Sequence, residues 1–411
     1  MSGLRTVEEQ LERVLAAVRP LEAHVVPVPA AIGRTLREPL RAAVDIPVFD
    51  NSAMDGFAVR FADVADASPD RPARLQVVAD LPAGTALDPA LRAGQAARIM
   101  TGSPVPTAAD AIVPFEDTAG GLADSLGEIE VRHAPAAVGA HIRRRGGDAR
   151  TGDELLPAGV ALGPLQLAAA AAAGVAEVVV SRAPRVIVVS TGSELVAPGL
   201  PLTHGQIPES NSELLAGLVA EAAGEVVLRT TVADDGDGPA RIVAEAGRLG
   251  ADVVVFSGGV SAGAYEVVKN TLGEVMEFAR VAMQPGKPQG FGATAGGVLL
   301  FGLPGNPVSA AVSFEVFVRP ALLALQGRSD LERPRMLLPA ASAWRTPPGR
   351  RQYLPAVIDR TDPARWTVAP ATGGGSASHL AGGLARAQAW AIVPAETAEV
   401  AVGDAVEVML R

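Results

Sequence analysis

The chain has 411 residues, of which 48% are hydrophobic and 19% are charged, so it can bury more than one core and is not a disordered protein. Its 35 Lys and Arg against 45 Asp and Glu give a net charge of −10, which argues against nucleic acid as a partner. It contains no cysteine, which excludes disulfides, iron–sulfur clusters and cysteine nucleophiles, and its five histidines never stand at i, i+4 spacing, which argues against a histidine-based zinc site.

The first twenty residues carry the pattern of an amphipathic helix. Apolar residues from Leu4 to Val18 fall on one helical stripe, and Thr6 and Glu9 have the spacing of a capping box. Acidic residues interrupt any signal-peptide core, and the longest apolar run, 167–176, is about half of the ~20 residues that a membrane span requires. We therefore expect residues 1–20 to pack as a helix on a folded domain of a cytoplasmic protein that has no membrane contact.

The rest of the chain divides by pattern into four further parts. Segments interrupted by prolines predict an extended connector. Short strands between Pro and Gly turns predict an inserted β-rich domain. Regular alternation of strands and helices predicts a central, open, mostly parallel α/β sheet. A second small β domain is expected at the C-terminal end. The expected ranges are 21–48 with 139–172 for the connector, 49–138 for the inserted domain, 173–326 for the α/β domain and 327–411 for the last. The two connector segments are expected to pair side by side.

Three Gly-rich junctions follow strands of the predicted α/β sheet. Ligands of such sheets bind beyond the carboxyl ends of the strands, where small residues let the backbone approach an anion and helix N-termini present free N–H groups. Each junction taken alone is more typical of an ordinary glycine turn than of a binding loop, but three at one sheet edge favour a phosphate or oxyanion ligand. The candidate binding residues are Ser190, Thr191, Gly192, Ser257, Gly258, Gly259, Ser261, Pro304, Gly305, Asn306 and Pro307.

Carboxylates accompany these junctions at Glu194, Asp234 and Glu266. Because Mg²⁺ prefers one or two carboxylates together with substrate phosphate oxygens, these side chains are candidates for a Mg²⁺ site; the alternative is that they only cap helices. Lys287, one of very few lysines, stands in a turn between two prolines. It is either a positioned cation or a solvated loop residue.

Residues 259–263 also match the G-x-S-x-G pattern of a serine hydrolase, with Ser261 as the nucleophile. The triad would need a later histidine, and His379 is the only one after Ser261. No HGGG-type oxyanion segment occurs, so this alternative is weaker than the anion-binding interpretation.

Further turn-rich segments lie outside the predicted α/β sheet, namely DNSAMDGFAVR (50–60), RIMTGSPVP (98–106), ADAIVPFED (109–117) and RRRGGD (143–148). Within the predicted α/β domain stand STGSEL (190–195), SGGVS (257–261), PGKP (285–288) and GLPGNPVSA (302–310). Together these motifs resemble the MoeA family of molybdopterin molybdenumtransferases, whose eukaryotic relatives include the E domains of gephyrin and of plant Cnx proteins. The resemblance runs nearly end to end.

The resemblance implies an elongated four-part subunit with a MogA-like central domain, assembled as a cytoplasmic homodimer. It also implies a reaction: adenylylated molybdopterin is bound with Mg²⁺ held by Glu194 and Asp234, molybdate is loaded onto the dithiolene, and AMP is released. Molybdopterin adenylyltransferase is the protein partner that it suggests. Because gephyrin also organises partners, a non-catalytic molybdopterin-binding scaffold stays an alternative.

Individual positions follow from the same resemblance. Glu194, Asp234 and Glu266 match catalytic positions, and so do Asp55, Thr101 and Asp148, which would face the sheet edge of the other subunit. The molybdate pocket would consist of residues 304–307, Lys287, Arg350 and Ser378. The chain departs from the family pattern at three places: Glu266 stands for an aspartate, Gln284 for a lysine and Pro355 for an arginine.

Overall fold

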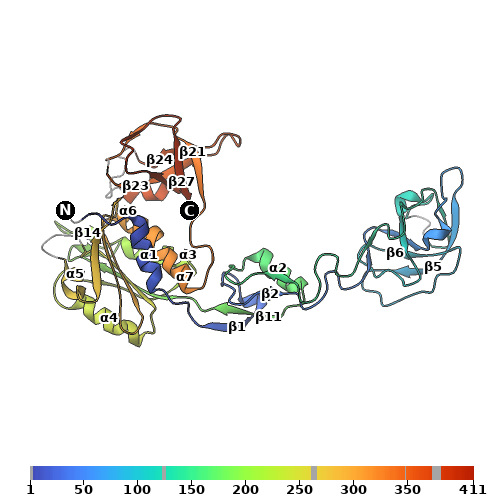
Figure 1. Ribbon diagram of the computed structural model, residues 1–411, viewed down its shortest axis with the longest axis horizontal. Coiled ribbons are helices and arrows are strands. Elements are labelled where there is room, and N and C mark those ends of the chain that lie inside the picture. Colours follow the sequence, from blue (N-terminus) through green and yellow to red (C-terminus); the bar gives the residue numbers. More distant parts are fainter. Residues whose placement is uncertain (1–2, 123–125, 261–265, 348, 373–380) are drawn as a thin grey trace.

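The computed structural model places its domains along one long axis (Figure 1). The α/β domain and the C-terminal β domain adjoin at one end, a small β-rich unit stands at the other, and the connector runs between them. Both chain termini lie at the α/β end. The described residues are 3–122, 126–260, 266–347, 349–372 and 381–411.

Helix α1 (Val7–Ala17) begins with the expected capping box. The Glu9 backbone N–H donates to Thr6 Oγ1 at 3.1 Å, and the Thr6 N–H donates to the Glu9 carboxylate at 2.8 Å. Val7 and Val14 are buried in one hydrophobic cluster with the strands and helices of the α/β domain. The helix is therefore held by packing as well as by its cap.

A six-stranded sheet forms the centre of the α/β domain, with the strand order β15-β12-β16-β20-β19-β17. The first four strands pair in parallel, which confirms the mostly parallel sheet, whereas β19 and β17 are antiparallel additions at one edge. The strand–helix pattern did not predict this edge, because β19 is rich in Pro and Gly. The bounds are β12 Arg185–Thr191, β15 Glu225–Val232, β16 Val253–Ser257, β17 Met276–Arg280, β19 Pro288–Ala293 and β20 Leu299–Leu303.

Helices cover both faces of this sheet. Alternate residues of β12 point to opposite sides: Val186 and Val188 join the cluster with α1, α3 and α6, while Ile187 and Val189 join the cluster with α4 and α5. This explains why residues 186–189 of β12 and 253–256 of β16 are continuously apolar. The bounds are α3 Asn211–Glu221, α4 Gly238–Arg248, α5 Val267–Leu272, α6 Pro307–Ser313 and α7 Arg319–Leu325.

A π-helical segment, Phe314–Val318, joins α6 to α7 in one helical run. This run, Pro307–Leu325, is long and apolar enough to cross a membrane by length and composition, but 89% of its apolar window is buried inside the protein. Its buried Glu315 accepts hydrogen bonds from Arg333 at 3.0 Å. The run is the central helix of the α/β domain's hydrophobic core.

The connector is built from short antiparallel pairs. Strand β2 (Leu40–Arg41) pairs with β10 (Glu154–Leu156), which confirms the expected pairing of the two connector segments. Strand β1 (Ala23–Pro27) pairs with β11 (Glu177–Ser181) rather than with the α/β sheet, so by strand pairing the connector extends past residue 172. The domain boundaries themselves stay a prediction. Further elements are α2 Pro164–Ala172, β3 Asn51–Ser52 and β9 Ile142–Arg143.

Two further sheets complete the chain. The β-rich unit has the order β7-β4-β6-β5-β8, with β4 Gly56–Val59, β5 Ala73–Leu81, β6 Gln95–Ile99, β7 Ala111–Pro114 and β8 Glu128–Val131. The C-terminal sheet has the order β18-β23-β25-β27-β21, with β24 paired to β23. Its strands are β18 Met283–Gln284, β21 Arg335–Pro339, β23 Arg351–Asp359, β24 Thr367–Pro370, β25 Ala389–Val393 and β27 Ala405–Leu410. A separate antiparallel pair, β22 Trp344–Arg345 with β26 Glu399–Val400, belongs to the same C-terminal part of the chain.

Candidate functional site

One cavity of about 390 Å³ lies where the parallel strands β12, β15, β16 and β20 end. Because these four strands are neighbours in the sheet, the loops that follow them meet at a single edge. The structure thereby brings together residues from all three Gly-rich junctions and all three candidate carboxylates. The predicted residues that line the cavity are Thr191, Gly192, Glu194, Asp234, Gly258, Gly259, Glu266, Pro304, Gly305, Asn306 and Pro307.

The junctions pack backbone against backbone. Gly258 has a φ of +95°, and a Cβ placed on it would lie 2.5 Å from Thr191 Oγ1 and 2.7 Å from the Thr191 carbonyl oxygen. A Cβ on Gly305 would lie 3.4 Å from the Gly258 Cα. The Thr191 hydroxyl donates to the Ser257 carbonyl at 3.3 Å, so the first two loops are also linked by a hydrogen bond. Glycine is therefore required at 258 by both conformation and space.

All the charged side chains in the described lining of this cavity are acidic. Four carboxylates, those of Glu194, Glu209, Asp234 and Glu266, line it, while no Lys, Arg or His does so among the described residues. Asp234 is fixed by the first loop, since the Ser193 backbone N–H donates to its carboxylate at 2.9 Å. Across the described part of the chain no group of three or more His, Asp or Glu side chains is arranged to hold a metal ion without a ligand's help.

Glu209, which the sequence analysis missed, is buried in the cavity wall. Its carboxylate accepts hydrogen bonds from Ser190 Oγ at 2.7 Å, from the Ser212 backbone N–H at 2.9 Å and from Ser212 Oγ at 2.5 Å. Burial raises the pKa of this carboxyl, but the hydrogen bonds from Ser212 and Ser190 outweigh it and leave the pKa below its ordinary value. The ionised Glu209 carboxylate thus links the end of β12 to the start of α3 by hydrogen bonds.

A second missed residue, Asn211, is the first residue of α3. Its side-chain amide donates to the Gly305 carbonyl at 2.7 Å and so ties the third junction to the helix. The signal for both residues is the segment Glu-Ser-Asn-Ser at 209–212 directly before an apolar helical run, which has the composition of a helix start. This segment belongs to none of the three strand-end junctions, so the junction pattern does not point to it.

Two predicted binding serines lie behind the cavity rather than in its lining. Ser190 and Ser257 are 0% and 1% exposed, and their hydroxyl oxygens lie 3.5 Å apart. Their side chains support the loops in this structure, and a substrate-binding role for them stays a prediction. Ser261 and Ser378 lie outside the described residues. Ser261 is also the nucleophile of the alternative hydrolase interpretation.

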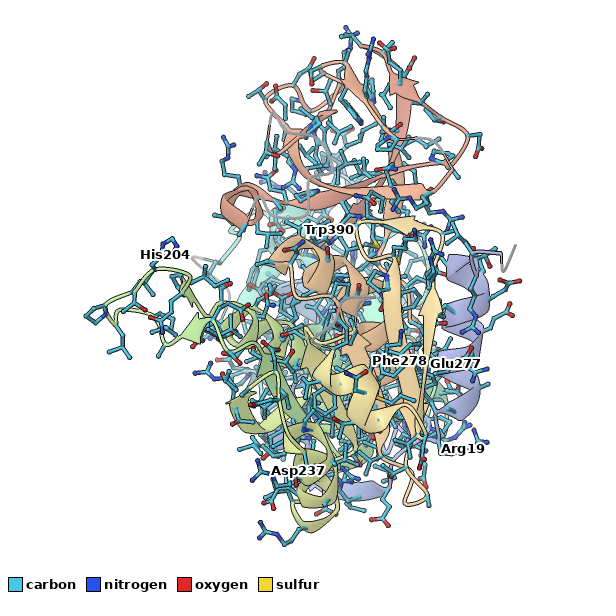
Figure 2. The ribbon with its side chains drawn as sticks, turned by 90° about the vertical axis from the view of Figure 1, so that its left-hand side faces the viewer. Arg19, His204, Asp237, Glu277, Phe278 and Trp390 are labelled. Carbon is cyan, nitrogen blue, oxygen red and sulfur yellow. The ribbon has the colours of Figure 1, made fainter. Side chains whose placement is uncertain are left out.

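The parallel pair β13 (Leu195–Val196) and β14 (Ile207–Pro208) borders the cavity, with Leu195, Ile207 and Pro208 in its lining. The loop between the two strands projects from the domain and carries His204, far from the buried Trp390 (Figure 2). Leu200 and Leu202 in this loop are 59% and 48% exposed. One side of the cavity is therefore apolar and is formed by Leu195, Ile207 and Pro208.

Lys287 lies in a neighbouring cavity of about 560 Å³, not in the one that residues 304–307 line. Val260, Lys269 and Arg280 also line this second cavity, and the chain's two lysines therefore share it. The two cavities adjoin along the chain, because Gly259 lines the first and Val260 the second. The positive charge of Arg280, then burial, then the charge of Arg350 lower the pKa of Lys287.

The positions where the chain departs from the family pattern have defined places. Glu266 lines the first cavity. Gln284 lies in β18 and is paired with Gln352 of the C-terminal sheet, and Pro355 lies within β23 opposite Trp390. Arg350 directly precedes β23 and lines neither cavity.

Asp55, Thr101 and Asp148 are not brought to either cavity within one chain. Asp55 accepts hydrogen bonds from the Thr101 backbone N–H at 2.6 Å and from its hydroxyl at 2.8 Å, and these bonds lower the pKa of the Asp55 carboxyl. Asp148 lies at the start of the connector's return segment, where its backbone N–H donates to the Ile46 carbonyl at 2.9 Å. The unit that carries Asp55 and Thr101 stands at the far end of the long axis from the α/β domain (Figure 1).

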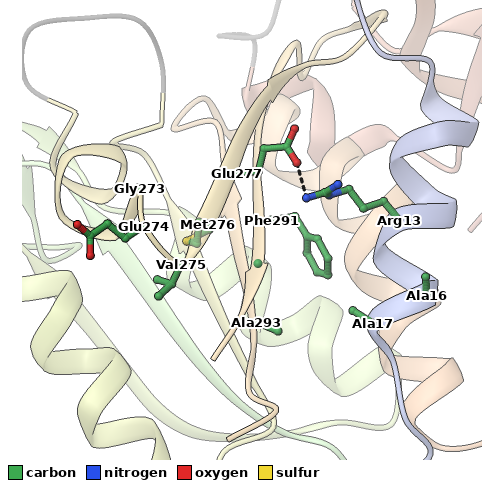
Figure 3. Close-up of a pocket in the computed structure, with 11 residues that line it drawn as sticks. Arg13, Ala16, Ala17, Gly273, Glu274, Val275, Met276, Glu277, Phe291 and Ala293 are labelled. Atoms are coloured by element: carbon green, nitrogen blue, oxygen red, sulfur yellow. Dashed lines mark ion pairs between the residues drawn. The ribbon is translucent and has the colours of Figure 1, made fainter. Parts of the chain in front are cut away.

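A larger cavity of about 640 Å³ lies between α1 and the antiparallel edge of the sheet. Arg13 and Glu277 form an ion pair across it, and Phe291 points into it (Figure 3). It contains none of the predicted site residues. Size alone therefore does not identify the functional cavity here.

Comparisons with known proteins cover nearly the whole chain. Family models match residues 5–174 (MoeA N-terminal region, domain I and II), 187–324 (probable molybdopterin binding domain) and 338–410 (MoeA C-terminal region, domain IV).

Individual relatives agree with these matches. The chain is 43% identical over 419 residues to Molybdopterin molybdenumtransferase 2 of Mycobacterium tuberculosis (strain CDC 1551 / Oshkosh), a match that covers 98% of this chain and 99% of the relative. It is 37% identical over 413 residues to Molybdopterin molybdenumtransferase of Synechococcus elongatus, with 97% of each chain covered. The crystal structure of the molybdopterin biosynthesis MoeA protein from Pyrococcus horikoshii OT3 superposes with a TM-score of 0.83 at 26% identity over 100% of both chains. The expected multidomain α/β fold is thereby confirmed, and the chain belongs to the MoeA family.

Proposed function

We propose that this protein is a molybdopterin molybdenumtransferase, an enzyme that transfers molybdenum from molybdate to molybdopterin. In the finer form of the proposal, the pterin arrives as adenylylated molybdopterin and AMP is released. The observation that carries the proposal is the pair of adjoining cavities, one acidic and ringed by backbone loops, the other lined by both lysines of the chain.

The acidic cavity is proposed to hold the phosphates of the substrate. Its glycines let backbone N–H groups approach an anion, but its four carboxylates would repel a phosphate that came without a cation. Glu194 and Asp234 fit a Mg²⁺ ion that takes its remaining ligands from phosphate oxygens and water. When bound, the ion would offset charge on the anhydride that is cleaved. Glu266 adds a third carboxylate in reach of the same cavity.

The lysine cavity is proposed to receive molybdate, a tetrahedral dianion. Lys269, Arg280 and Lys287 line it and no carboxylate does so in the described residues, so an anion there meets only positive charge. Arg350 contributes its charge from nearby, since it is among the groups that lower the pKa of Lys287. Ser378 is assigned to the same pocket by resemblance alone. Because the loop from Gly258 to Val260 borders both cavities, molybdate and pterin would meet along it.

A homodimer is proposed in which Asp55, Thr101 and Asp148 serve the cavity of the other subunit. The support is their exposed placement, away from the cavities of their own chain. The protein would act in the cytoplasm and receive its substrate from a molybdopterin adenylyltransferase.

Incubation of the full chain with adenylylated molybdopterin, Mg²⁺ and molybdate tests the function. We expect AMP release that depends on both ions, and no AMP under any of these conditions would overturn the transferase. The Glu194→Ala variant should keep its thermal unfolding midpoint but lose turnover. A wild-type protein that binds molybdopterin without releasing AMP would instead be the scaffold that the sequence left open.

A further inference from the structure

The lysine cavity is larger than molybdate requires. Its volume of about 560 Å³ falls within the ~300–1,000 Å³ of pockets that enclose a whole organic ligand, whereas molybdate is a single metal atom with its oxygens. Two lysines and an arginine supply its positive charge. The rest of its described lining is apolar and consists of Val260, Phe278, Ala279 and Pro288. The cavity therefore offers an apolar surface beside its cations, and a hydrated dianion cannot use that surface.

Phe278 is the only aromatic residue in the described lining of either cavity. It lies in β17 directly opposite Gly290 of β19, and a Cβ placed on Gly290 would lie 2.7 Å from Phe278 Cε1. The ring is therefore held against the glycine, where a larger side chain would displace it. Because Phe278 is only partly buried and lines the cavity, a ligand in the cavity can reach its ring.

The Phe278 ring stands at the sheet edge that also carries the acidic cavity. Strand β17 runs antiparallel to β19, which runs antiparallel to β20, so β17 and β20 point in the same direction. The carboxyl end of β17 therefore reaches the edge at which the Gly-rich loops meet. Lys269, which lines the lysine cavity, is tied to one of these loops because its backbone N–H donates to the Gly259 carbonyl at 3.1 Å. A ligand that spans both cavities thus passes the loop at Gly259 on its way to Phe278.

The covalent structure of the substrate decides which part of it reaches the ring. In molybdopterin the two sulfurs that receive the metal are attached to a ring that is fused to the pterin, and the phosphate arm leaves from the other side of that ring. With molybdate among the lysines and the phosphates in the acidic cavity, the pterin must lie on the lysine side. Planar heteroaromatic rings stack on aromatic side chains, and the carbonyl and ring nitrogens of a pterin can accept hydrogen bonds from lysine or arginine.

We propose that the lysine cavity binds the pterin ring system together with molybdate, and that Phe278 stacks on the pterin as a specificity-determining residue. The inference rests on the proposed function, from which it takes the substrate, and it adds the place and the contact of the pterin. The adenine of the nucleotide half is a second planar heteroaromatic ring, so the experiment has to separate the two.

Isothermal titration calorimetry of the full chain with three separate probes tests the inference. The probes are 6-hydroxymethylpterin, adenosine and molybdate. In Phe278→Leu, which keeps an apolar side chain but removes the aromatic face, we expect about tenfold weaker binding of the pterin and unchanged binding of the other two probes. Phe278→Tyr restores the aromatic face and should bind the pterin like the wild type. Phe61→Leu, at a partly buried phenylalanine of the β-rich unit, is the matched control and should leave all three affinities unchanged.

Three results for Phe278→Leu would overturn the inference. Unchanged pterin binding would mean that the ring is not used, and a loss for adenosine instead of the pterin would assign the ring to the nucleotide. An equal loss for the pterin and molybdate would mean that Phe278 only shapes the cavity.

Two further measurements do not depend on that variant. If Phe278→Leu does not fold, nuclear Overhauser effects from the bound pterin to the Phe278 ring of the wild-type protein, labelled at its ten phenylalanines, take its place, and their absence would contradict the inference. A wild-type protein that releases AMP from adenylylated molybdopterin but binds no pterin contradicts this inference alone. One that does neither overturns the proposed function as well.

Discussion

Ser193 and Asp234 are joined by two reciprocal hydrogen bonds. The Ser193 N–H donates to the Asp234 carboxylate at 2.9 Å, and the Asp234 N–H donates to the Ser193 hydroxyl at 3.2 Å. These bonds lock the loop after β12, which carries Glu194, to the loop after β15. The two carboxylates proposed to hold Mg²⁺ are therefore positioned by contacts between loops 41 residues apart.

Replacing the Asp234 carboxylate should remove activity without unfolding the protein. In Asp234→Asn the loops can still be bonded through the amide oxygen, but the charge for the metal is gone, so we expect AMP release to fall about 100-fold or more, equivalent to about 2.7 kcal/mol. The unfolding midpoint should stay within a few degrees. Asp235→Asn, the exposed neighbour that does not line the cavity, is the control. Equal rates for the two variants would contradict the metal-binding role.

Gly258→Ala should damage the cavity through its backbone. A Cβ there meets the Thr191 carbonyl oxygen at 2.7 Å and must adopt a φ of +95°, so we expect the free energy of unfolding to fall by about 3 kcal/mol. Denaturant unfolding measures this. Gly217→Ala lies in the interior of α3 with nothing within 4 Å of its Cβ, and should stabilise the protein by up to about 1 kcal/mol. Equal free energies of unfolding for the two variants would mean that the close backbone approach at Gly258 does not exclude a side chain.

Glu209→Gln should lower stability in a pH-dependent way. Because the folded-state pKa of Glu209 lies below its reference value of 4.5, the carboxylate contributes stability that is fully present above that pH and is lost as pH falls through the folded-state pKa. We expect the variant to be about 1–3 kcal/mol less stable than wild type at pH 7, since the amide cannot accept the same charge-assisted bonds, and the gap to narrow below pH 4.5. Unfolding in denaturant at both pH values measures it. Glu12→Gln, an exposed substitution on α1, should show no such gap.

Arg280→Gln should change how Lys287 titrates. The charge of Arg280 is the main cause that lowers the pKa of Lys287, so its removal should raise that pKa toward the ordinary value. With two lysines in the chain, NMR of reductively ¹³C-methylated protein gives two lysine side-chain signals to follow. Molybdate affinity should fall several-fold, and more at low ionic strength. Arg13→Gln, on α1 outside this cavity, is the control. An unchanged Lys287 titration would contradict the electrostatic coupling.

The local elements of the α/β domain were predictable from pattern. The buried strands β12, β16 and β20 each contain a run of at least three consecutive apolar residues, and the capping box at Thr6 and Glu9 marks the first helix. Since parallel neighbours end at one edge, the convergence of Glu194, Asp234, Gly258 and Pro304 also followed from sequence. The antiparallel edge did not, because β19 contains one Pro and two Gly and β17 includes the charged Glu277 and Arg280, so neither strand is a continuous apolar run.

The sequence by itself determined the family, the strand-end loops and the residue types of the site, because these depend on spacing along the chain. Only the tertiary structure decided that Lys287 and residues 304–307 line two adjoining cavities, that both lysines share one of them, and that Glu209 and Asn211 form a wall of the other. The reason is physical. Burial and hydrogen bonding, such as the Ser190 hydroxyl bond to Glu209 and the Asn211 amide bond to the Gly305 carbonyl, arise from contacts between segments distant in sequence, and no local pattern specifies them.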